Sequence, residues 1–127
     1  MSQSIIVYGV SDMTGETVAR IVRAASAQFP SGEVTIKILQ HASSAQQIID
    51  FIDAQGDSNQ PCAVFHTILS GNVRKDLRNA LQTLHIPSVD LLGSTAHVMA
   101  DLLDERPQET PGLTIDDGVE PLYFDLA

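Results

Sequence analysis

The sequence predicts an α/β fold with a parallel sheet, and the order of its segments is the main reason. Short runs rich in Val and Ile alternate four times with longer segments whose apolar residues recur every three or four positions. Clusters of Ser, Asp, Gly and Pro separate most of these segments. This alternation is typical of parallel strands joined by helices. The chain has 127 residues, 43% of them hydrophobic, which is enough for one core.

Each predicted element follows from its own pattern. Pro30 and Gly32 end the first helix, and Ser43 and Ser44 cap the second. The strand that begins at Cys62 is almost continuously apolar, as suits a strand buried on both faces. The expected strands are about 4–10, 33–40, 62–67 and 88–92, and the expected helices are about 15–29, 44–54, 72–84 and 95–104.

Right-handed crossovers arrange these elements as a Rossmann-like, doubly wound parallel sheet of about four strands, in three α/β/α layers. We expect the strand order 2-1-3-4, because it places a switch point of the topology beside the first strand. Helices should then cover both faces of the sheet. We expect the one basic cluster, Arg74, Lys75 and Arg78, on the outer face of the third helix.

The charge is distributed unevenly. The net charge is −9, and residues 104–127 alone carry seven acidic residues against Arg106. That region also contains three of the prolines, so we expect residues 1–104 to form the α/β domain and 105–127 an extended acidic arm. Within the arm, Leu122-Tyr123-Phe124 is the one candidate for a short strand.

Composition also argues against several classes of function. The acidic balance argues against nonspecific binding of nucleic acid. No apolar run approaches the roughly 18 residues of a membrane span, and no signal peptide is visible, so we expect a cytoplasmic protein. Cys62 is the only cysteine, which excludes a disulfide scaffold and suggests a buried, inert thiol. The spacings match no metal motif, and we expect no metal.

The segment 11–17 joins the first strand to the first helix. Open α/β sheets bind ligands at such junctions, and the free N–H groups at the start of a helix favour an anion. It is not a nucleoside triphosphate loop, because Glu16 stands where such a loop needs Lys. The alternative role is helix capping by Thr14 or Asp12, with Glu16 favourable in the first turn. The candidate anion-binding residues are Ser11, Asp12, Thr14, Gly15, Glu16 and Thr17.

Other polar residues end the neighbouring strands, and parallel topology brings them to the same edge of the sheet. They are His41, His66, Thr67 and Asp90. Asp12 with His41 or His66 has the residue types for an acid–base pair, although histidines at such positions are also common as simple strand-end residues. Asp90 suits a cap or a hydrogen-bond anchor. We assign no catalytic residue.

Three stretches resemble the regulatory proteins of pyruvate,phosphate dikinase and phosphoenolpyruvate synthase. The segment 11–17, Ser-Asp-Met-Thr-Gly-Glu-Thr, resembles that family's S-D-S-T-G-E-T signature, with Met13 in place of Ser. Residues 27–30 resemble its helix end, and 84–93 resemble its L-G-I-P-x-V-D-L-L-G segment. Weaker similarity occurs at 111–113 and at Tyr123-Phe124, so the resemblance covers most of the chain.

The resemblance implies a specific activity. Members of that family phosphorylate a threonine of their target enzyme with ADP, and remove that phosphate with inorganic phosphate. Their P-loop lies in a second half of the protein, and no G-x-x-x-x-G-K-[ST] occurs in the present sequence. The resemblance therefore implies an amino-terminal regulatory or substrate-docking domain, without a cofactor of its own, whose partner is one of the two enzymes. A homodimer is also possible. The alternatives are a self-standing domain that binds an anion or small ligand, and a protein-interaction module that uses the acidic arm.

Overall fold

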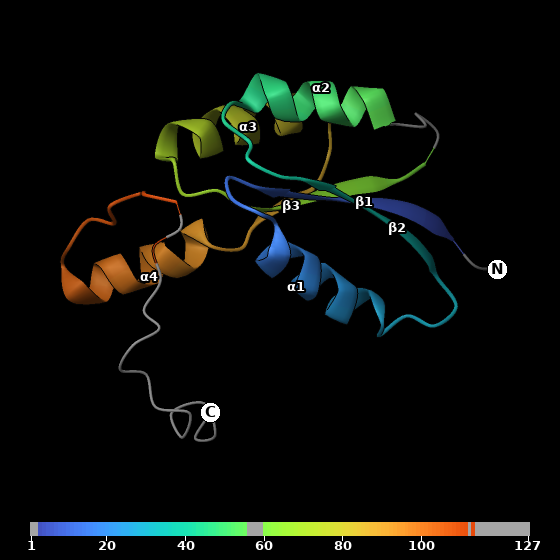
Figure 1. Cartoon of the computed structure of the whole chain (residues 1–127), viewed down its shortest axis with the longest axis horizontal. Coiled ribbons are helices and arrows are strands. Elements are labelled where there is room, and N and C mark those ends of the chain that lie inside the picture. The colour runs from blue at the N-terminus through green and yellow to red at the C-terminus, as the bar shows by residue number, and fades with distance from the viewer. Residues whose placement is uncertain (1–2, 56–59, 112, 114–127) are drawn as a thin grey trace.

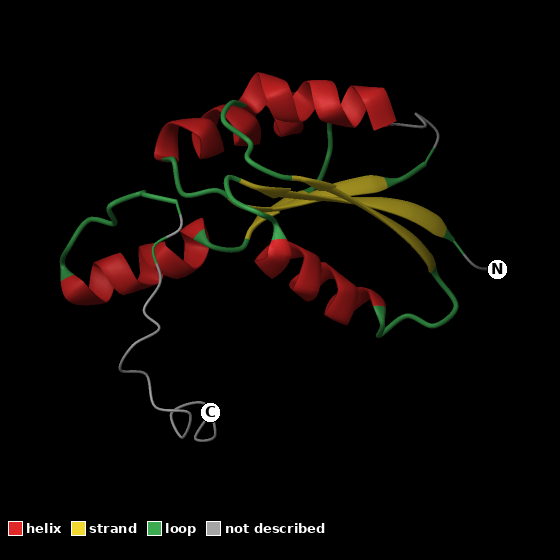
Figure 2. Cartoon of the chain, viewed as in Figure 1, coloured by secondary structure: helices red, strands yellow, loops and turns green. Residues whose placement is uncertain are grey.

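The chain folds into one four-stranded sheet flanked by helices (Figures 1 and 2). The computed structural model describes residues 3–55, 60–111 and 113. The strands are β1 (Ser4–Ser11), β2 (Glu33–Leu39), β3 (Cys62–Thr67) and β4 (Ser88–Asp90). The helices are α1 (Glu16–Ser26), α2 (Ala45–Gln55), α3 (Gly71–Thr83) and α4 (Gly93–Leu103). Each element occurs where the sequence predicts it, with ends that differ by up to three residues.

The strand order is β2-β1-β3-β4 and every pairing is parallel, which confirms the predicted topology. In the central strand, Val7 lies beside Ile36 of β2 on one side and Ala63 of β3 on the other. Figure 1 shows α2 and α3 on one face of the sheet and α1 on the opposite face. The fold is therefore the three-layer, Rossmann-like α/β arrangement that was expected.

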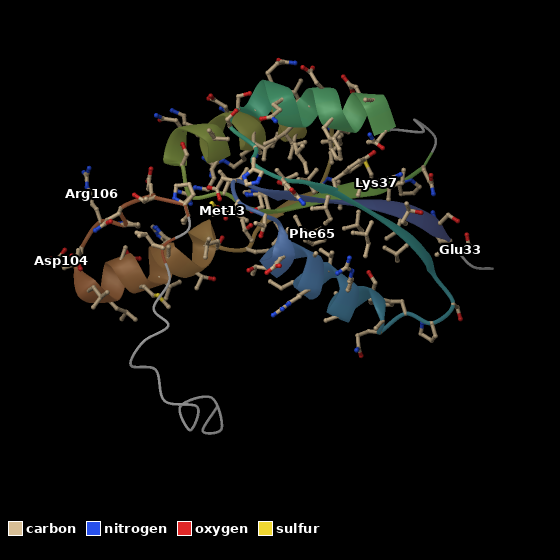
Figure 3. All side chains as sticks on the ribbon, viewed as in Figure 1. Met13, Glu33, Lys37, Phe65, Asp104 and Arg106 are labelled. Carbon is tan, nitrogen blue, oxygen red and sulfur yellow. The ribbon has the colours of Figure 1, made fainter. Side chains whose placement is uncertain are left out.

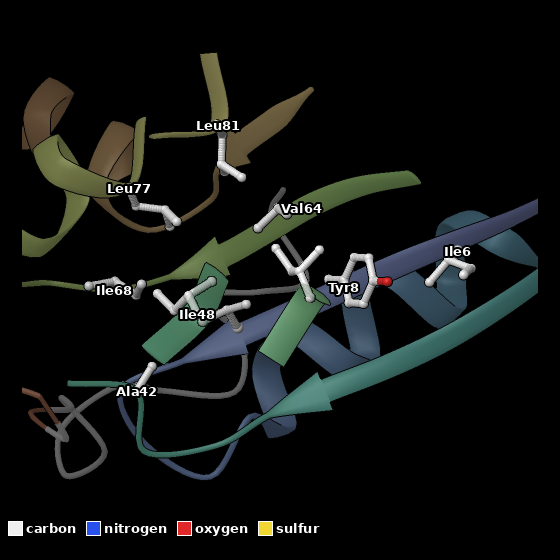
Figure 4. Packing of buried hydrophobic residues seen from close by; sticks show 10 residues of the cluster. Ile6, Tyr8, Ala42, Ile48, Val64, Ile68, Leu77 and Leu81 are labelled. Carbon is white, nitrogen blue, oxygen red and sulfur yellow. The ribbon is translucent and has the colours of Figure 1, made fainter. Parts of the chain in front are cut away.

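The larger core lies between the sheet and the pair α2 and α3 (Figure 4). It forms because apolar residues at helical spacing on α2 and α3 meet the side chains on one face of β1 and β3. The Tyr8 ring meets Phe51 of α2 edge-on, with centroids 6.1 Å apart. The buried residues of this core are Ile6, Tyr8, Val10, Ala42, Ile48, Ile52, Val64, Ile68, Leu77 and Leu81.

The smaller core lies on the α1 face, where Val18 and Val22 of α1 pack against Val7. Close packing here depends on Gly9. A Cβ at this position would lie 2.7 Å from the Cδ1 atom of Ile38 and 3.4 Å from both methyl groups of Val18. Because Gly9 has no side chain, α1 lies close to the strand that leads into residues 11–17, which we call the candidate anion loop.

Helix α4 lies beyond the edge of the sheet (Figure 1). Its side chains Val98, Met99, Leu102 and Leu103 are between 57 and 83% exposed. Val89 of β4 is also 45% exposed, so the sheet is only partly covered near β4. The apolar pattern predicts the helix correctly, but a pattern does not identify the surface against which a helix packs.

Two further predictions concern the ends of elements. The first helix was expected to continue to residue 29, but α1 ends at Ser26 and the next residues form tight turns, with the Phe29 N–H donating to the Ser26 carbonyl. In the arm, residues 105–110 form neither helix nor strand. The possible strand at 122–124 lies outside the described residues. No helix in the described part is both long and apolar enough to span a bilayer.

Candidate functional site

A cavity of about 380 Å³ lies at the carboxyl edge of the sheet, where β1 and β3 end. The first of these strands leads into α1 on one face and the second into α3 on the other, so the cavity occupies the switch point of the topology. Its size is within the range of small-ligand pockets. The whole candidate anion loop lines it, together with Thr67, Leu69, Leu92 and Leu113.

Hydrogen bonds hold the loop from both sides. The Asp12 carboxylate accepts a 2.9 Å hydrogen bond from the Leu69 N–H, which ties the β1–α1 loop to the β3–α3 loop. On the other side, the Ala42 N–H donates to the Ser11 carbonyl and the His41 N–H donates to the Met13 carbonyl, both at 2.9 Å. Ser11 also accepts the Met13 N–H with its hydroxyl at 2.9 Å. The loop is therefore a fixed wall of the cavity.

Gly15 marks the start of α1. It has φ of 87°, in the left-handed region, and a Cβ there would lie 2.8 Å from the Cγ2 atom of Ile38. Only glycine meets both constraints without strain. Gly15 itself is the N-cap, and no side chain caps this helix within the described part of the chain. The capping role considered for Thr14 or Asp12 is therefore wrong, and Asp12 instead binds Leu69.

The uncapped start of α1 leaves backbone donors available beside the cavity. The first N–H groups of a helix have no partner within the helix, and the helix dipole makes this end partly positive. Thr14 and Thr17 are exposed and line the same cavity, so their hydroxyl groups add donors. Glu16 lies in the first turn as expected, and its carboxylate opposes a bound anion. Met13 is 40% exposed at this edge (Figure 3).

The two candidate histidines do not join this cavity. His41 is exposed, adopts φ of 53°, and contributes its backbone N–H to the loop. His66 is 4% exposed and has its Nδ1 atom 3.9 Å from an oxygen of Asp90. Within the described residues, Asp12 makes no ion pair with either histidine, and its carboxylate accepts the Leu69 N–H.

Asp90 is the centre of a second polar cluster. Its Oδ1 atom accepts the Gly93 N–H at 2.7 Å, and its Oδ2 atom accepts from Arg74 Nη1 at 3.3 Å. A Cβ at Gly93 would collide with both Arg74 and Asp90. The predicted role of Asp90 as a hydrogen-bond anchor is confirmed: it fastens α3 and the start of α4 to β4.

Arg74 was expected on the outer face of α3 with Lys75 and Arg78, and this is wrong. Its side chain is only 24% exposed and also approaches Glu109, with Nη2 3.8 Å from a carboxylate oxygen. The sequence contained a signal for this position. Arg74 precedes Leu77 by three residues and Leu81 by seven, which places it on the inward stripe of the helix.

The environment of His66 favours its neutral form. Burial lowers the pKa of His66 below the usual 6.5; the Asp90 charge opposes this shift and the Arg74 charge adds to it. The Nδ1 atom of His66 and the Nε atom of Arg74 are both buried without a hydrogen-bond partner in the described structure. Such groups are uncommon in folded proteins and are costly to leave unpaired.

A larger cavity of about 540 Å³ lies at the opposite, amino edge of the sheet. Ile6, Tyr8, Pro61 and Cys62 contribute to its lining, which is mostly apolar. Burial raises the pKa of the Cys62 thiol, in keeping with the inert role expected for it. We favour the smaller cavity as the functional site, because it combines the switch point with free backbone donors. In the described part of the chain, no three potential ligand residues lie together as a metal site requires.

A parallel sheet with helices on both faces and a cavity at its switch point defines a Rossmann-like α/β domain. The chain belongs to the kinase/pyrophosphorylase family, whose family model matches residues 7–125.

Curated relatives agree with this assignment. The chain is 31% identical over 107 residues to a protein of Citrifermentans bemidjiense, and 33% identical over 135 residues to one of Rhodospirillum rubrum. Both are named as regulatory proteins of pyruvate, phosphate dikinase, as is a protein of Geotalea daltonii with 32% identity over 107 residues. The matches cover 84, 98 and 84% of the present chain but 39, 47 and 39% of the relatives, so the chain spans less than half of their length.

Replacing Gly15 with alanine should destabilise the domain by about 1–3 kcal/mol, because a side chain is strained at positive φ. The matched control is Gly32→Ala, where the new Cβ would make an ordinary 3.6 Å contact with the Phe29 carbonyl. We expect that control to stay within about 0.5 kcal/mol of wild type. Urea unfolding measures both, and equal losses would contradict the special role of Gly15.

The stability of the domain should depend on pH through His66. Because burial lowers the pKa of His66 in the folded state, the unfolded chain takes up this proton first as the pH falls. The contribution is complete above about pH 6.5 and is lost below it. We expect His66→Asn to lose less stability than wild type between about pH 7.5 and 5.5. The control variant His97→Asn, on the exposed surface of α4, should follow wild type; identical losses in all three proteins would refute the prediction.

Proposed function

We propose that this chain acts as the regulatory or substrate-docking domain of a phosphotransferase that controls pyruvate,phosphate dikinase or phosphoenolpyruvate synthase. The regulation would consist of reversible phosphorylation of a threonine of the target, with ADP and inorganic phosphate as co-substrates of the whole protein. Family membership and the names of the relatives support this role. Cytoplasmic location remains part of the proposal.

The observation that carries the proposal is the cavity beside the uncapped start of α1. Its donors are backbone N–H groups and threonine hydroxyls, which suit a phosphoryl group. The neighbouring charges limit affinity. Glu16 and Asp12 both carry charges that repel an anion, and the hydrogen bond from the Leu69 N–H to the Asp12 carboxylate offsets only part of that repulsion. A weak, exchangeable phosphate site is the function that this geometry supports best.

Two features favour a docking domain over a complete catalyst. The sequence holds no P-loop, and phosphoryl transfer from a nucleotide requires a cradle for its phosphates and metal ion. Helix α4 exposes large apolar side chains, and an exposed apolar patch is typical of a protein contact surface. In this proposal the present domain recognises phosphate and docks the target enzyme, and another part of the whole protein carries out the nucleotide chemistry.

Inorganic phosphate should bind at the start of α1 with a Kd in the millimolar range, or about −4 kcal/mol. Amide chemical shifts during a phosphate titration measure this, with sodium chloride added to hold the ionic strength constant. We expect changes at residues 14–18. Thr14→Ala or Thr17→Ala should raise the Kd about threefold to tenfold through the loss of one hydrogen bond.

The control for this titration is Thr83→Ala, which removes an exposed hydroxyl at the far end of α3 and should leave the Kd unchanged. Unchanged amide shifts at 14–18 up to high millimolar phosphate would remove the support for a phosphate site in this loop.

The pure chain should transfer no phosphate from ADP to either target enzyme, because the sequence lacks a P-loop. The assay uses ADP labelled at its β-phosphate, with a full-length relative as the positive control. Labelled target in the presence of this chain alone would overturn the docking-domain proposal.

A further inference from the structure

The segment after α4 returns to the carboxyl edge of the sheet. The chain turns at Asp104, which has φ of 51°, and then runs back past α4 (Figure 1). Leu113 contributes to the lining of the cavity at the candidate anion loop. We call residues 105–111 the strap. Contacts between the strap and α3 hold the strap at this edge.

One carboxylate fastens the strap. Glu109 Oε1 accepts the Gly71 N–H at 2.9 Å, and its Oε2 atom lies 3.8 Å from Arg74 Nη2. Gly71 is the first residue of α3, so the carboxylate lies at the partly positive end of a helix of 13 residues. A Cβ at Gly71 would lie 3.0 and 3.1 Å from the two carboxylate oxygens, so the glycine makes room for them.

The strap pays a conformational cost to make this contact. Glu109 has φ of 57°, a left-handed conformation that residues other than glycine rarely adopt. The contact is also long-range, because Glu109 and Gly71 are 38 residues apart in the chain. Glu109 keeps this unfavourable backbone conformation while its carboxylate binds α3, which indicates that the contact is specific.

The surrounding cluster has more donors than its carboxylates satisfy. Asp90 and Glu109 together engage two backbone N–H groups and both terminal nitrogens of Arg74. The Arg74 Nε–H is a donor that still has no partner in the described structure. The Nδ1 atom of His66 also lacks a partner, but it faces Asp90 and donates in only one tautomer of a neutral imidazole, so it is not counted as a donor to this site. The cluster therefore favours an additional acceptor or an anion with more oxygens than a carboxylate.

We propose that Glu109 is an internal competitor in a second anion site, formed by the Gly71 N–H and the Arg74 guanidinium. A phosphate group has the charge and the tetrahedral set of acceptors to replace the carboxylate there. Its entry releases Glu109 and frees the strap from α3. This site lies on α3 and not on α1, so the inference goes beyond the proposed function and stands or falls independently of it.

The test is a phosphate titration of wild type and of Glu109→Gln at constant ionic strength, followed at the Gly71 amide and the Arg74 Nε–H. Glutamine keeps the length of the side chain but loses its charge. We expect the half-saturating phosphate concentration at Gly71 to fall at least about fivefold in the variant, since a charge-assisted competitor has been removed. A parallel titration with O-phosphothreonine shows whether the site also accepts a phosphomonoester. A response to inorganic phosphate but not to O-phosphothreonine would mean that the site is too small for an ester.

Two controls separate this inference from simple charge effects. Glu105→Gln makes the same change in net charge on an exposed residue of the strap that contacts neither Gly71 nor Arg74, and it should match wild type. Arg74→Lys, combined with Glu109→Gln, retains the positive charge but loses the planar fork, and it should reverse the gain. In wild type, phosphate should also increase the amide mobility of Gln108 and Thr110 as the strap detaches.

The proposal fails if the Gly71 amide of Glu109→Gln does not respond to phosphate, or if Glu105→Gln gains as much as Glu109→Gln. The titration also distinguishes the two sites. Shifts at 14–18 without a response at Gly71 would support the α1 site and overturn this inference. A response at Gly71 without shifts at 14–18 would support this inference and remove the support for the α1 site.

Discussion

The hydrogen bond from the Leu69 N–H to the Asp12 carboxylate determines the shape of the candidate site. It joins the loops that follow β1 and β3, and the cavity lies between those loops. A hydrogen bond to a charged group contributes about 1.5–3 kcal/mol, which is substantial for a domain of this size. It also places the negative charge of Asp12 against a backbone donor, which weakens its repulsion of an anion nearby. One contact thus serves both the fold and the chemistry of the site.

The helices α1 and α3 begin at the same edge of the sheet but differ in how their first N–H groups are satisfied. The start of α1 has a glycine N-cap and no capping side chain in the described structure. The start of α3 has the Ser70 hydroxyl, 3.4 Å from the Val73 N–H, and the Glu109 carboxylate at Gly71. The same local electrostatics therefore produces an open site in one case and an occupied one in the other.

Much of the fold was predictable, because it follows from local patterns. The alternation of apolar runs specified the elements, and the expectation of a switch point beside the first strand favoured the order that is observed. Ser44 at the start of α2, and Asp90 as an anchor, also followed from short-range chemistry. What could not be predicted depends on distance in the chain. Glu109 contacts α3 across 38 residues of sequence. The local apolar pattern of α4 likewise does not show that its large apolar side chains remain exposed.

Gly93 restricts how this sequence can change. Its missing side chain leaves the space in which Arg74 and Asp90 meet, so even a methyl group there would separate them. An alanine at this position clashes with both side chains, and shortening Arg74 removes only one clash, because both Asp90 carboxylate oxygens would still collide with the new Cβ. The effects of substitutions at positions 74 and 93 are therefore not additive. A lineage that lost Arg74 would still need the glycine for as long as the Asp90 carboxylate binds the N–H of residue 93.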